Sequence, residues 1–374
     1  ARAEGADAAR SLTVSAGRLP DPQLILGVDN LPVSGPDALS ATRDAMTMRK
    51  VGVMQEFPSA RKRRLQRERA EAEAGVADAE LQQSRLEVAR DVAAAWIRRA
   101  TAEVSLRELM ALEPEVALQA DAVRAAVASG RSTTAEALAA DTEVGQFANR
   151  ILQMRSEIRK ATLDLGRWID VDPSQPLAAM PSFDELPTPA AALLASADQQ
   201  GPMLPYESRM AAARAEVDLA DAERRPDWSA ELVFAKRAPD LSNMVMLQFR
   251  VGLPLFTRHR QDPVVSARHA DLRRLEAERA TALRAYTTEL KQMLADWELL
   301  GSQIRRYERD QLPLARERSR AALAAYGAGR GELRAVLEAR RQEIEFVLDH
   351  ARLQGERGRD WAFLRFASPL QVRF

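Results

Sequence analysis

The sequence repeats itself after about 200 residues, and this repeat constrains the fold more than any other feature. Matched residues keep the same order in both halves and always lie 199 or 200 positions apart. They pair Val51-Gly52 with Val251-Gly252, Phe57 with Phe256, Pro114 with Pro313, Gly130-Arg131 with Gly329-Arg330, and Leu138 and Ala140 with Leu337 and Ala339. We therefore predict two tandem copies of one unit, made of a β-hairpin, a very long helix, a glycine turn and a returning helix.

Each copy contains a long stretch almost free of proline, which is typical of helices much longer than those of a globular core. Between Pro58 and Pro173 the only other proline is Pro114, and apolar residues lie three, four or seven positions apart. This spacing is that of an α-helix. One helix from Ser59 to Ser129 is about 105 Å long at 1.5 Å per residue. Because so long a helix needs lateral partners, we predict antiparallel coiled-coil packing.

Residues 22–57 and 228–256 alternate between apolar and polar side chains, as half-buried strands do. Each segment is split by a turn-rich stretch, so each predicts a hairpin of roughly ten-residue strands, long enough to cross a bilayer when tilted. In the second hairpin the alternation runs from Val245 to Leu255. Four strands cannot close a barrel, and an open edge in lipid leaves backbone groups without hydrogen bonds. If the hairpins enter a membrane, several chains must share one barrel: two chains give eight strands and three give twelve.

Composition excludes several functions. The 374 residues include 54 basic and 54 acidic ones, and the resulting zero net charge argues against a bulk nucleic-acid binder. Cysteine is absent and there are only three histidines, which excludes thiolate chemistry and disulfides and leaves little for an imidazole metal centre. No stretch reaches the roughly 18 apolar residues of a spanning helix, and we expect any export signal to lie outside this chain. Since no catalytic motif is found, we predict a protein that is not an enzyme and needs no cofactor.

Several short segments along the chain have a distinctive order and spacing. They are Leu19-Pro20-Asp21-Pro22, Val51-Gly52-Val53-Met54-Gln55-Glu56-Phe57-Pro58, Val251-Gly252-Leu253-Pro254-Leu255-Phe256, Leu312-Pro313, Tyr326-Gly327-Ala328-Gly329 and Val336-Leu337-Glu338-Ala339. Together they resemble the TolC-like outer membrane efflux channels of Gram-negative bacteria. The likeness covers nearly the whole chain. Within the family, Gln55-Glu56-Phe57-Pro58 and the preceding Met46-Thr47-Met48 look most like the heavy-metal branch, the outer components of cobalt–zinc–cadmium or copper–silver exporters.

This resemblance implies a mainly helical α+β fold in a homotrimer, with a twelve-strand β-barrel in the outer membrane and a twelve-helix α-barrel in the periplasm. It also implies a passive export duct for heavy-metal cations that works with a periplasmic adaptor protein and an inner-membrane pump of the RND type. The expected segments are the end of an N-terminal helix (1–18), a first membrane hairpin (19–58), a first long helical hairpin (59–170), an irregular equatorial connector (171–205), a short helix (206–225), a second membrane hairpin (226–257), a second long helical hairpin (258–366) and a C-terminal tail (367–374).

The long helices are expected to reverse at Gly130-Arg131 and Gly329-Arg330, because glycine supplies the left-handed conformation that ends a helix. The resemblance implies that these turns are periplasmic tips that contact the adaptor; otherwise they are plain helix-reversal turns. It also implies a ring of tip acids that constricts the tunnel and favours cations. Glu338 matches one of two such family positions, Ala335 stands at the other, and Glu136 is the candidate on the first tip. The alternative for both glutamates is simple solvation or a salt bridge.

Basic residues begin the two long helices, where they oppose the helix dipole. At the inner rim of a barrel they would meet anionic lipid head groups, although simple solvation is an equal alternative. These candidates are Arg61, Lys62, Arg63, Arg64, Arg258 and Arg260.

Three methionines are candidates for a soft-metal path. On the alternation, Met244 and Met246 share the polar face with Gln248, and Met46 is the repeat counterpart of Met246. Thioethers that face a water-filled lumen suit Cu(I) or Ag(I), whereas methionines that only pack inside the barrel are the alternative. The same alternation puts Arg49 on the lipid-facing side.

A second class of function fits the same periodicity: a soluble periplasmic coiled-coil adaptor or scaffold, with the hairpins as small sheets. The two predictions differ in the apolar strand residues, which a channel exposes to lipid and an adaptor buries in its own core. Organic drugs are the alternative substrate class, since a duct contacts its cargo weakly.

Overall fold

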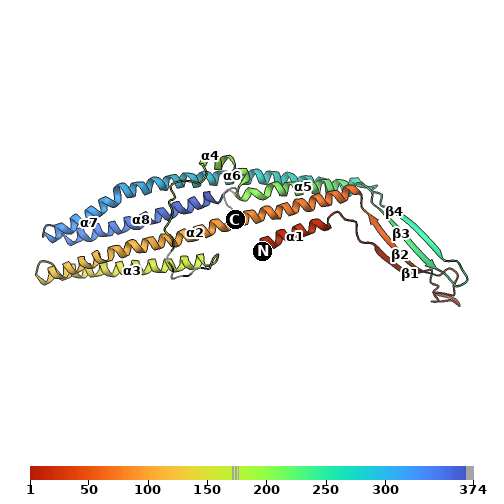
Figure 1. The fold of residues 1–374 in the computed structure, drawn as a ribbon, viewed down its shortest axis with the longest axis horizontal. Coiled ribbons are helices and arrows are strands. Elements are labelled where there is room, and N and C mark those ends of the chain that lie inside the picture. The colour runs from red at the N-terminus through yellow and green to blue at the C-terminus, as the bar shows by residue number, and fades with distance from the viewer. Residues whose placement is uncertain (171, 173–174, 176, 368–374) are drawn as a thin grey trace. The chain divides into compact units, whose positions relative to one another are not determined.

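The computed structural model describes residues 1–170, 172, 175 and 177–367. Helices dominate this part of the chain, and its strands form a single four-stranded sheet (Figure 1). The predicted mainly helical α+β fold is confirmed. Two compact units divide the chain, Ala1–Gln83 with Met203–Ala282 and Ser84–Pro202 with Leu283–Phe374. Residues 171, 173, 174 and 176 of the expected connector lie outside the described residues, as does the expected tail apart from Ala367.

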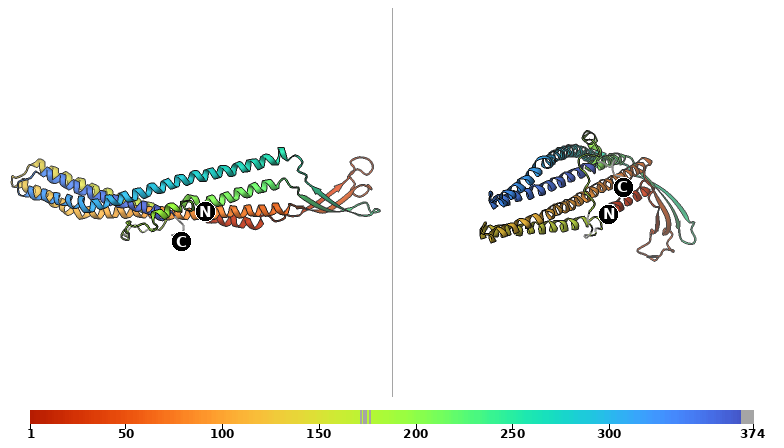
Figure 2. Two further views of the ribbon diagram at one scale, coloured as in Figure 1. Left: turned by 90° about the horizontal axis from the view of Figure 1, so that it is seen from above. Right: turned by 60° about the vertical axis from the view of Figure 1, so that its left-hand side comes forward.

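The first unit contains the sheet. Its strands are β1 (Gln23–Asp29), β2 (Met48–Phe57), β3 (Trp228–Lys236) and β4 (Met244–Val251). All neighbours are antiparallel in the order β1-β2-β3-β4, so β1 and β4 are edges without a further partner among the described residues. Figure 2 shows the two hairpins side by side in one curved layer.

β4 is shorter than the alternation predicts. It ends at Val251 instead of near Leu255, and a loop with a short turn, η3 (Thr257–His259), follows. Pro254 has no N–H to donate to a ladder, so the strand does not continue past it. In the first copy, by contrast, β2 extends to Phe57.

Helices α1 (Arg2–Ser15) and α5 (Leu204–Ala222) complete the first unit, together with the N-terminal parts of α2 (Ala60–Ala128) and α6 (Gln261–Arg306). Glu80 on α2 joins three of these helices. Its carboxylate pairs with Arg2 of α1 at 2.7 Å and with Arg209 of α5 at 2.6 Å.

α2 is one helix of 69 residues that includes Pro114, as predicted. Its counterpart is interrupted, because α6 is followed by a π-helical turn, η4 (Tyr307–Gln311), and then by α7 (Leu312–Gly327). A wider turn before Pro313 relieves the clash between the proline ring and the carbonyl of the preceding turn.

The second unit is a helical bundle. It combines the C-terminal parts of α2 and α6 with α3 (Thr134–Leu165), η4, α7 and α8 (Leu333–Arg365), and adds the short helices α4 (Ala190–Ala195), η1 (Ala197–Gln199) and η2 (Gly201–Met203). α3 runs back beside α2, and α8 beside α7 (Figure 1). Leu109, Phe147 and Ile344 form a core between α2, α3 and α8. Among the described residues no helix has the length and apolar character needed to cross a membrane.

Candidate functional site

The sheet has one apolar face, and the strand register aligns its side chains in rows. The middle row is Leu24, Val53, Leu232 and Leu247, and the next row toward the loops is Leu26, Val51, Phe234 and Val245. These eight residues are between 44 % and 70 % exposed. Contiguous apolar exposure on this scale marks a surface that another apolar phase covers.

The opposite face of the sheet is polar. Its middle row is Gln23, Met54, Glu231 and Gln248, directly next to the apolar middle row along each strand. Two ion pairs lie on this face, Lys50 with Asp29 at 2.9 Å and Arg250 with Glu231 at 2.6 Å. The sheet thus separates a polar surface from an apolar one.

Aromatic rings gather where the apolar face meets the helices. Phe57 and Trp228 stack with ring centroids 4.2 Å apart, and Phe249 lies 6.3 Å from Trp228. Aromatic residues at the border of an apolar band are typical of membrane interfaces. The stacking depends on the strand register, which the sequence does not give.

The three candidate methionines are placed differently. Met244 and Met246 lie on the polar face, opposite Ala235 and Val233, and are 43 % and 37 % exposed. Met46 was expected to be the counterpart of Met246 on the polar face. It lies two residues before β2 begins, so it is not part of the strand and the strand register does not assign it to either face. In the described part of the chain, no three histidine, aspartate or glutamate side chains come close enough together to hold a metal.

Asp227, just before β3, organises the junction between the sheet and the helices. Its Oδ1 accepts a hydrogen bond from the Ser59 backbone N–H at 3.0 Å, and its Oδ2 accepts one from Lys62 Nζ at 2.6 Å. Glu223 accepts a second bond from Lys62 at 3.2 Å. A carboxylate at this position satisfies a donor at the start of α2, where helical N–H groups lack partners. The Asp227 carbonyl also accepts the Gly252 N–H at 3.0 Å, so one residue ties β3, β4 and α2 together.

The expectation that Lys62 meets lipid head groups is wrong. Its side chain is 5 % exposed, and the amine is enclosed by Asp227 and Glu223. Burial lowers the pKa of Lys62, but the hydrogen bonds to these two carboxylates outweigh burial, so the pKa is raised and the amine stays charged. Sequence reasoning missed both partners because they lie more than 160 positions away.

The other basic residues at the helix starts differ in their partners. Arg61 pairs with Asp221 at 3.5 Å, and Arg64 pairs with Glu68 one helical turn on at 3.3 Å. Surface pairs of this kind contribute little stability. Three of the candidates make no ion pair within the described residues: Arg63, Arg258 and Arg260.

Gly130 and Gly329 end α2 and α7 in the left-handed conformation predicted for them, with φ angles of +73° and +69°. After each glycine, the N–H of Arg131 or Arg330 bonds to the carbonyl five residues earlier, at 2.8 and 2.9 Å. This is the Schellman arrangement at a helix end. Space is open around both glycines, so it is the backbone conformation that favours glycine here.

Glu136 and Glu338 are brought together by the fold. Both line an open depression of about 790 Å³ at the beginnings of α3 and α8. The Glu136 carboxylate accepts hydrogen bonds from the Ser132 hydroxyl at 2.6 Å and from the Thr133 N–H at 3.0 Å, which lower the pKa of Glu136. With Thr133 it forms a capping box, a local role that the spacing of Thr133 and Glu136 could have indicated.

Glu338 has no such local role. Its side chain is exposed and makes no hydrogen bond or ion pair in the described part of the chain. The salt bridge that was one alternative for Glu338 is not formed within the described residues, and the nearby Arg341 pairs with Glu143 instead. Glu338 is thus a free carboxylate at the tip end of the bundle.

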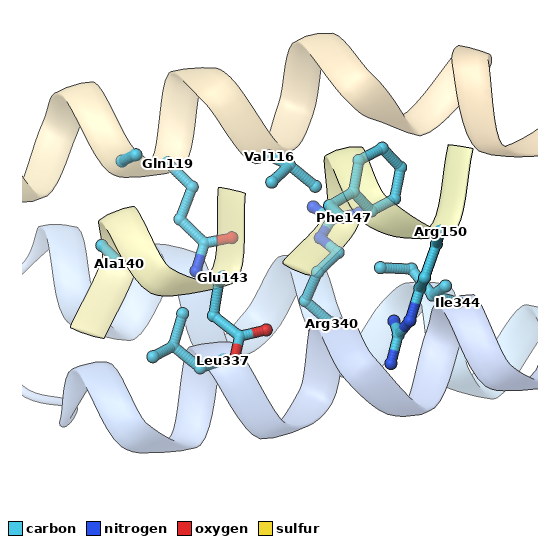
Figure 3. Close-up of a pocket in the computed structure, with 10 residues that line it drawn as sticks. Val116, Gln119, Ala140, Glu143, Phe147, Arg150, Leu337, Arg340 and Ile344 are labelled. Atoms are coloured by element: carbon cyan, nitrogen blue, oxygen red, sulfur yellow. The ribbon is translucent and has the colours of Figure 1, made fainter. Parts of the chain in front are cut away.

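A small enclosed cavity lies between α2, α3 and α8 (Figure 3). Gln119, Glu143 and Arg340 border it together with Val116 and Phe147, and its volume of about 20 Å³ suits one water molecule. Arg340 donates to Glu115 at 2.7 Å and to Glu343 at 2.9 Å. The cavity is too small for a larger ligand, so it is part of the bundle core and not a binding site.

The segment that contains β3, β4, α6, α7 and α8 matches a known protein family in its sequence. Residues 202–368 match the model described as outer membrane efflux protein. Over this segment, the chain is similar to outer membrane efflux proteins.

Solved structures extend the likeness to nearly the whole chain. CusC has 16 % identity and a TM-score of 0.81, covering 98 % of this chain and 88 % of that one. VceC from Vibrio cholerae has 17 % identity and a TM-score of 0.80, covering 98 % and 91 %. The open state of MtrE from Neisseria gonorrhoeae has 16 % identity and a TM-score of 0.73, covering 97 % and 84 %. At these identities the likeness shows the fold. A search of curated protein sequences finds no match.

Proposed function

We propose that three copies of this chain form the outer membrane channel of a tripartite efflux system, a passive duct that does no chemistry on its cargo. The observation that carries the proposal is the four-stranded sheet with two open edges and one exposed apolar face. In lipid the apolar face is favourable, and sister sheets supply the hydrogen bonds that the edges of β1 and β4 lack. Three sheets give a closed barrel of twelve strands, a strand number within the range of outer-membrane barrels.

The polar face lines the water-filled lumen in such a barrel, since the apolar face turns to lipid. The Lys50–Asp29 and Arg250–Glu231 pairs then neutralise charge along the duct. Met244 and Met246 also face the lumen, where their thioethers are available to Cu(I) or Ag(I).

The soluble adaptor is the weaker alternative. An adaptor would bury the apolar strand residues in its own core, but Leu24 and Leu247 are 66 % and 63 % exposed. In the ribbon of the first unit, the described helices end where the strands begin and do not cover the sheet (Figure 2).

The helical tips are the proposed contact with the periplasmic adaptor, and an RND-type pump of the inner membrane drives export. Gly130-Arg131 and Gly329-Arg330 present two exposed turns for this contact. Threefold symmetry turns the free Glu338 carboxylate into a ring that constricts the tunnel and attracts cations. Glu136, whose pKa is lowered, adds ionised charge to the same depression.

Arg258 and Arg260 are exposed and make no ion pair in the part of the chain that the structure describes. They are therefore the basic residues best placed to meet lipid head groups at the inner rim of the barrel.

Heavy-metal cations are the proposed cargo. The support is the resemblance of Gln55-Glu56-Phe57-Pro58 and Met46-Thr47-Met48 to the heavy-metal branch. Fold likeness gives no preference among branches, because CusC and VceC match equally well, at 16 % and 17 % identity.

A deletion strain tests channel and cargo separately. Growth is measured on zinc, cobalt, cadmium, copper and silver salts and on organic drugs, with complementation by the wild type, by Glu338→Gln and by the charge-matched control Glu317→Gln on α7. Metal sensitivity restored by the wild type and the control supports the proposal. Sensitivity to organic drugs alone contradicts the metal cargo but not the channel, whereas unchanged growth throughout, with no conductance in planar bilayers, contradicts the channel itself.

A further inference from the structure

Two basic residues lie opposite each other on the apolar face of the sheet. The register pairs Arg49 of β2 with Lys236 of β3. Each stands two residues from an apolar-row member, Arg49 from Val51 and Lys236 from Phe234, so both share the apolar face. They form the last row of that face, at the loop end of the strands.

This basic pair has no acidic partner among the residues that the structure describes. Like charges directly opposite in a ladder are destabilising. The other strand cations, Lys50 and Arg250, are paired with carboxylates on the polar face. Within the described residues Arg49 and Lys236 make no ion pair, and Arg49 Nε is buried without an acceptor.

A third cation adds to the local potential. Arg237 follows Lys236 in the loop and donates to the Ala45 carbonyl at 2.8 Å, again without an acidic partner in the described part of the chain. Unpaired cations side by side on a surface favour an anion between them.

The position of the pair along the strands indicates which anion. Trp228, in the aromatic cluster at the helix end, and Lys236 at the loop end are eight residues apart, which spans about 26 Å along a strand. At the usual tilt of barrel strands this is about 20 Å along the membrane normal, close to the height of an outer-membrane apolar band. The aromatic cluster and the basic pair therefore mark the two borders of the band.

We propose that Arg49 and Lys236 bind a phosphate group of an outer-leaflet lipid, the phosphorylated glucosamine head group of lipid A. This inference rests on the proposed function, which puts the helices in the periplasm and hence the loop end at the outer leaflet. The guanidinium of Arg49 suits two-point contact with phosphate oxygens, and Lys236 adds a point charge from the neighbouring strand. A phosphate between them removes the repulsion within the pair.

Native mass spectrometry of the purified full-length protein in detergent tests the site. The probes are bisphosphorylated lipid A, its dephosphorylated form and inorganic phosphate. The test variant is Arg49→Gln/Lys236→Gln, and the matched control is Lys50→Gln/Arg250→Gln, which removes two charges from the polar face of the same sheet. Assembly state and bilayer conductance are recorded for every variant.

We expect the test variant to bind bisphosphorylated lipid A about 30-fold more weakly, roughly fivefold for each basic residue, and the control to bind like the wild type. The single variants, each about fivefold weaker, carry the test if the double variant does not assemble. Equal lipid A binding by conducting wild-type and test oligomers overturns the lipid site alone. Displacement of lipid A by inorganic phosphate at equal phosphate concentration overturns the assignment to a lipid. A wild type that neither assembles nor conducts contradicts the proposed function instead.

Discussion

Leu247→Arg should be far more damaging than Gln248→Arg, although the two residues are neighbours on β4. Leu247 belongs to the middle row of the apolar face, and Gln248 belongs to the polar face opposite Glu231. An arginine at the bilayer midplane of a barrel costs about 2–4 kcal/mol. The proposed symmetric trimer contains three copies, so Leu247→Arg would cost about 6–12 kcal/mol per trimer, comparable to the whole stability of a typical domain. Gln248→Arg faces water and costs less than about 1 kcal/mol per chain.

The assay is the amount of assembled oligomer in isolated outer membranes, read from unboiled gels and compared with the boiled samples. We expect little or no assembled Leu247→Arg protein and near-normal amounts of Gln248→Arg protein. Urea titration in lipid vesicles should show the same order. Equal assembly of the two variants, or loss of assembly only for Gln248→Arg, would refute the assignment of the two faces.

Three further changes test the helical parts. Lys62→Met should lower the free energy of unfolding by about 1–3 kcal/mol, because the buried amine is lost while Asp227 can still be hydrated. The control Arg64→Met should change it by less than about 0.5 kcal/mol, because the Arg64–Glu68 pair is exposed. Urea denaturation followed by circular dichroism measures both, and equal effects would contradict the burial argument. Gly130→Ala should destabilise its turn by about 1 kcal/mol and speed hydrogen exchange of the tip amides about fivefold, and unchanged exchange would contradict it. Burial raises the pKa of Asp360 to about 6, so the stability that its protonated form contributes is present below about pH 4 and is lost as the pH rises to about 6. Asp360→Asn should remove this fall of about 1–2 kcal/mol in the free energy of unfolding, measured by thermal denaturation at pH 4.5 and 7.5. An unchanged pH profile would count against this reasoning.

Short-range sequence patterns predicted the long helix α2, the two faces of the sheet and the two helix ends at glycine. The period of apolar residues and the lack of proline predicted α2 even across Pro114, because a single proline in a well-packed helix is tolerated. Alternation predicted the two faces of the sheet, down to Arg49 on the apolar side. Glycine predicted the two helix ends.

Other features depend on contacts between distant residues or on competition between local effects. Asp227 and Lys62 meet across more than 160 positions, so no spacing rule could indicate the pair, and the basic run at the start of α2 appeared free. β4 ends early because Pro254 overrides an alternation that continues to Leu255. Glu136 was identified as a candidate for the constriction, but its immediate partners make it a helix cap as well.

Counting the chains in one assembled particle decides whether sister copies share one barrel. We expect the detergent-purified protein to have a mass near 124 kDa, three copies of the 41.4-kDa chain, and to form conducting pores in planar bilayers. A monomer of about 41 kDa that stays in solution without detergent, with the apolar strand residues protected from solvent, would contradict it.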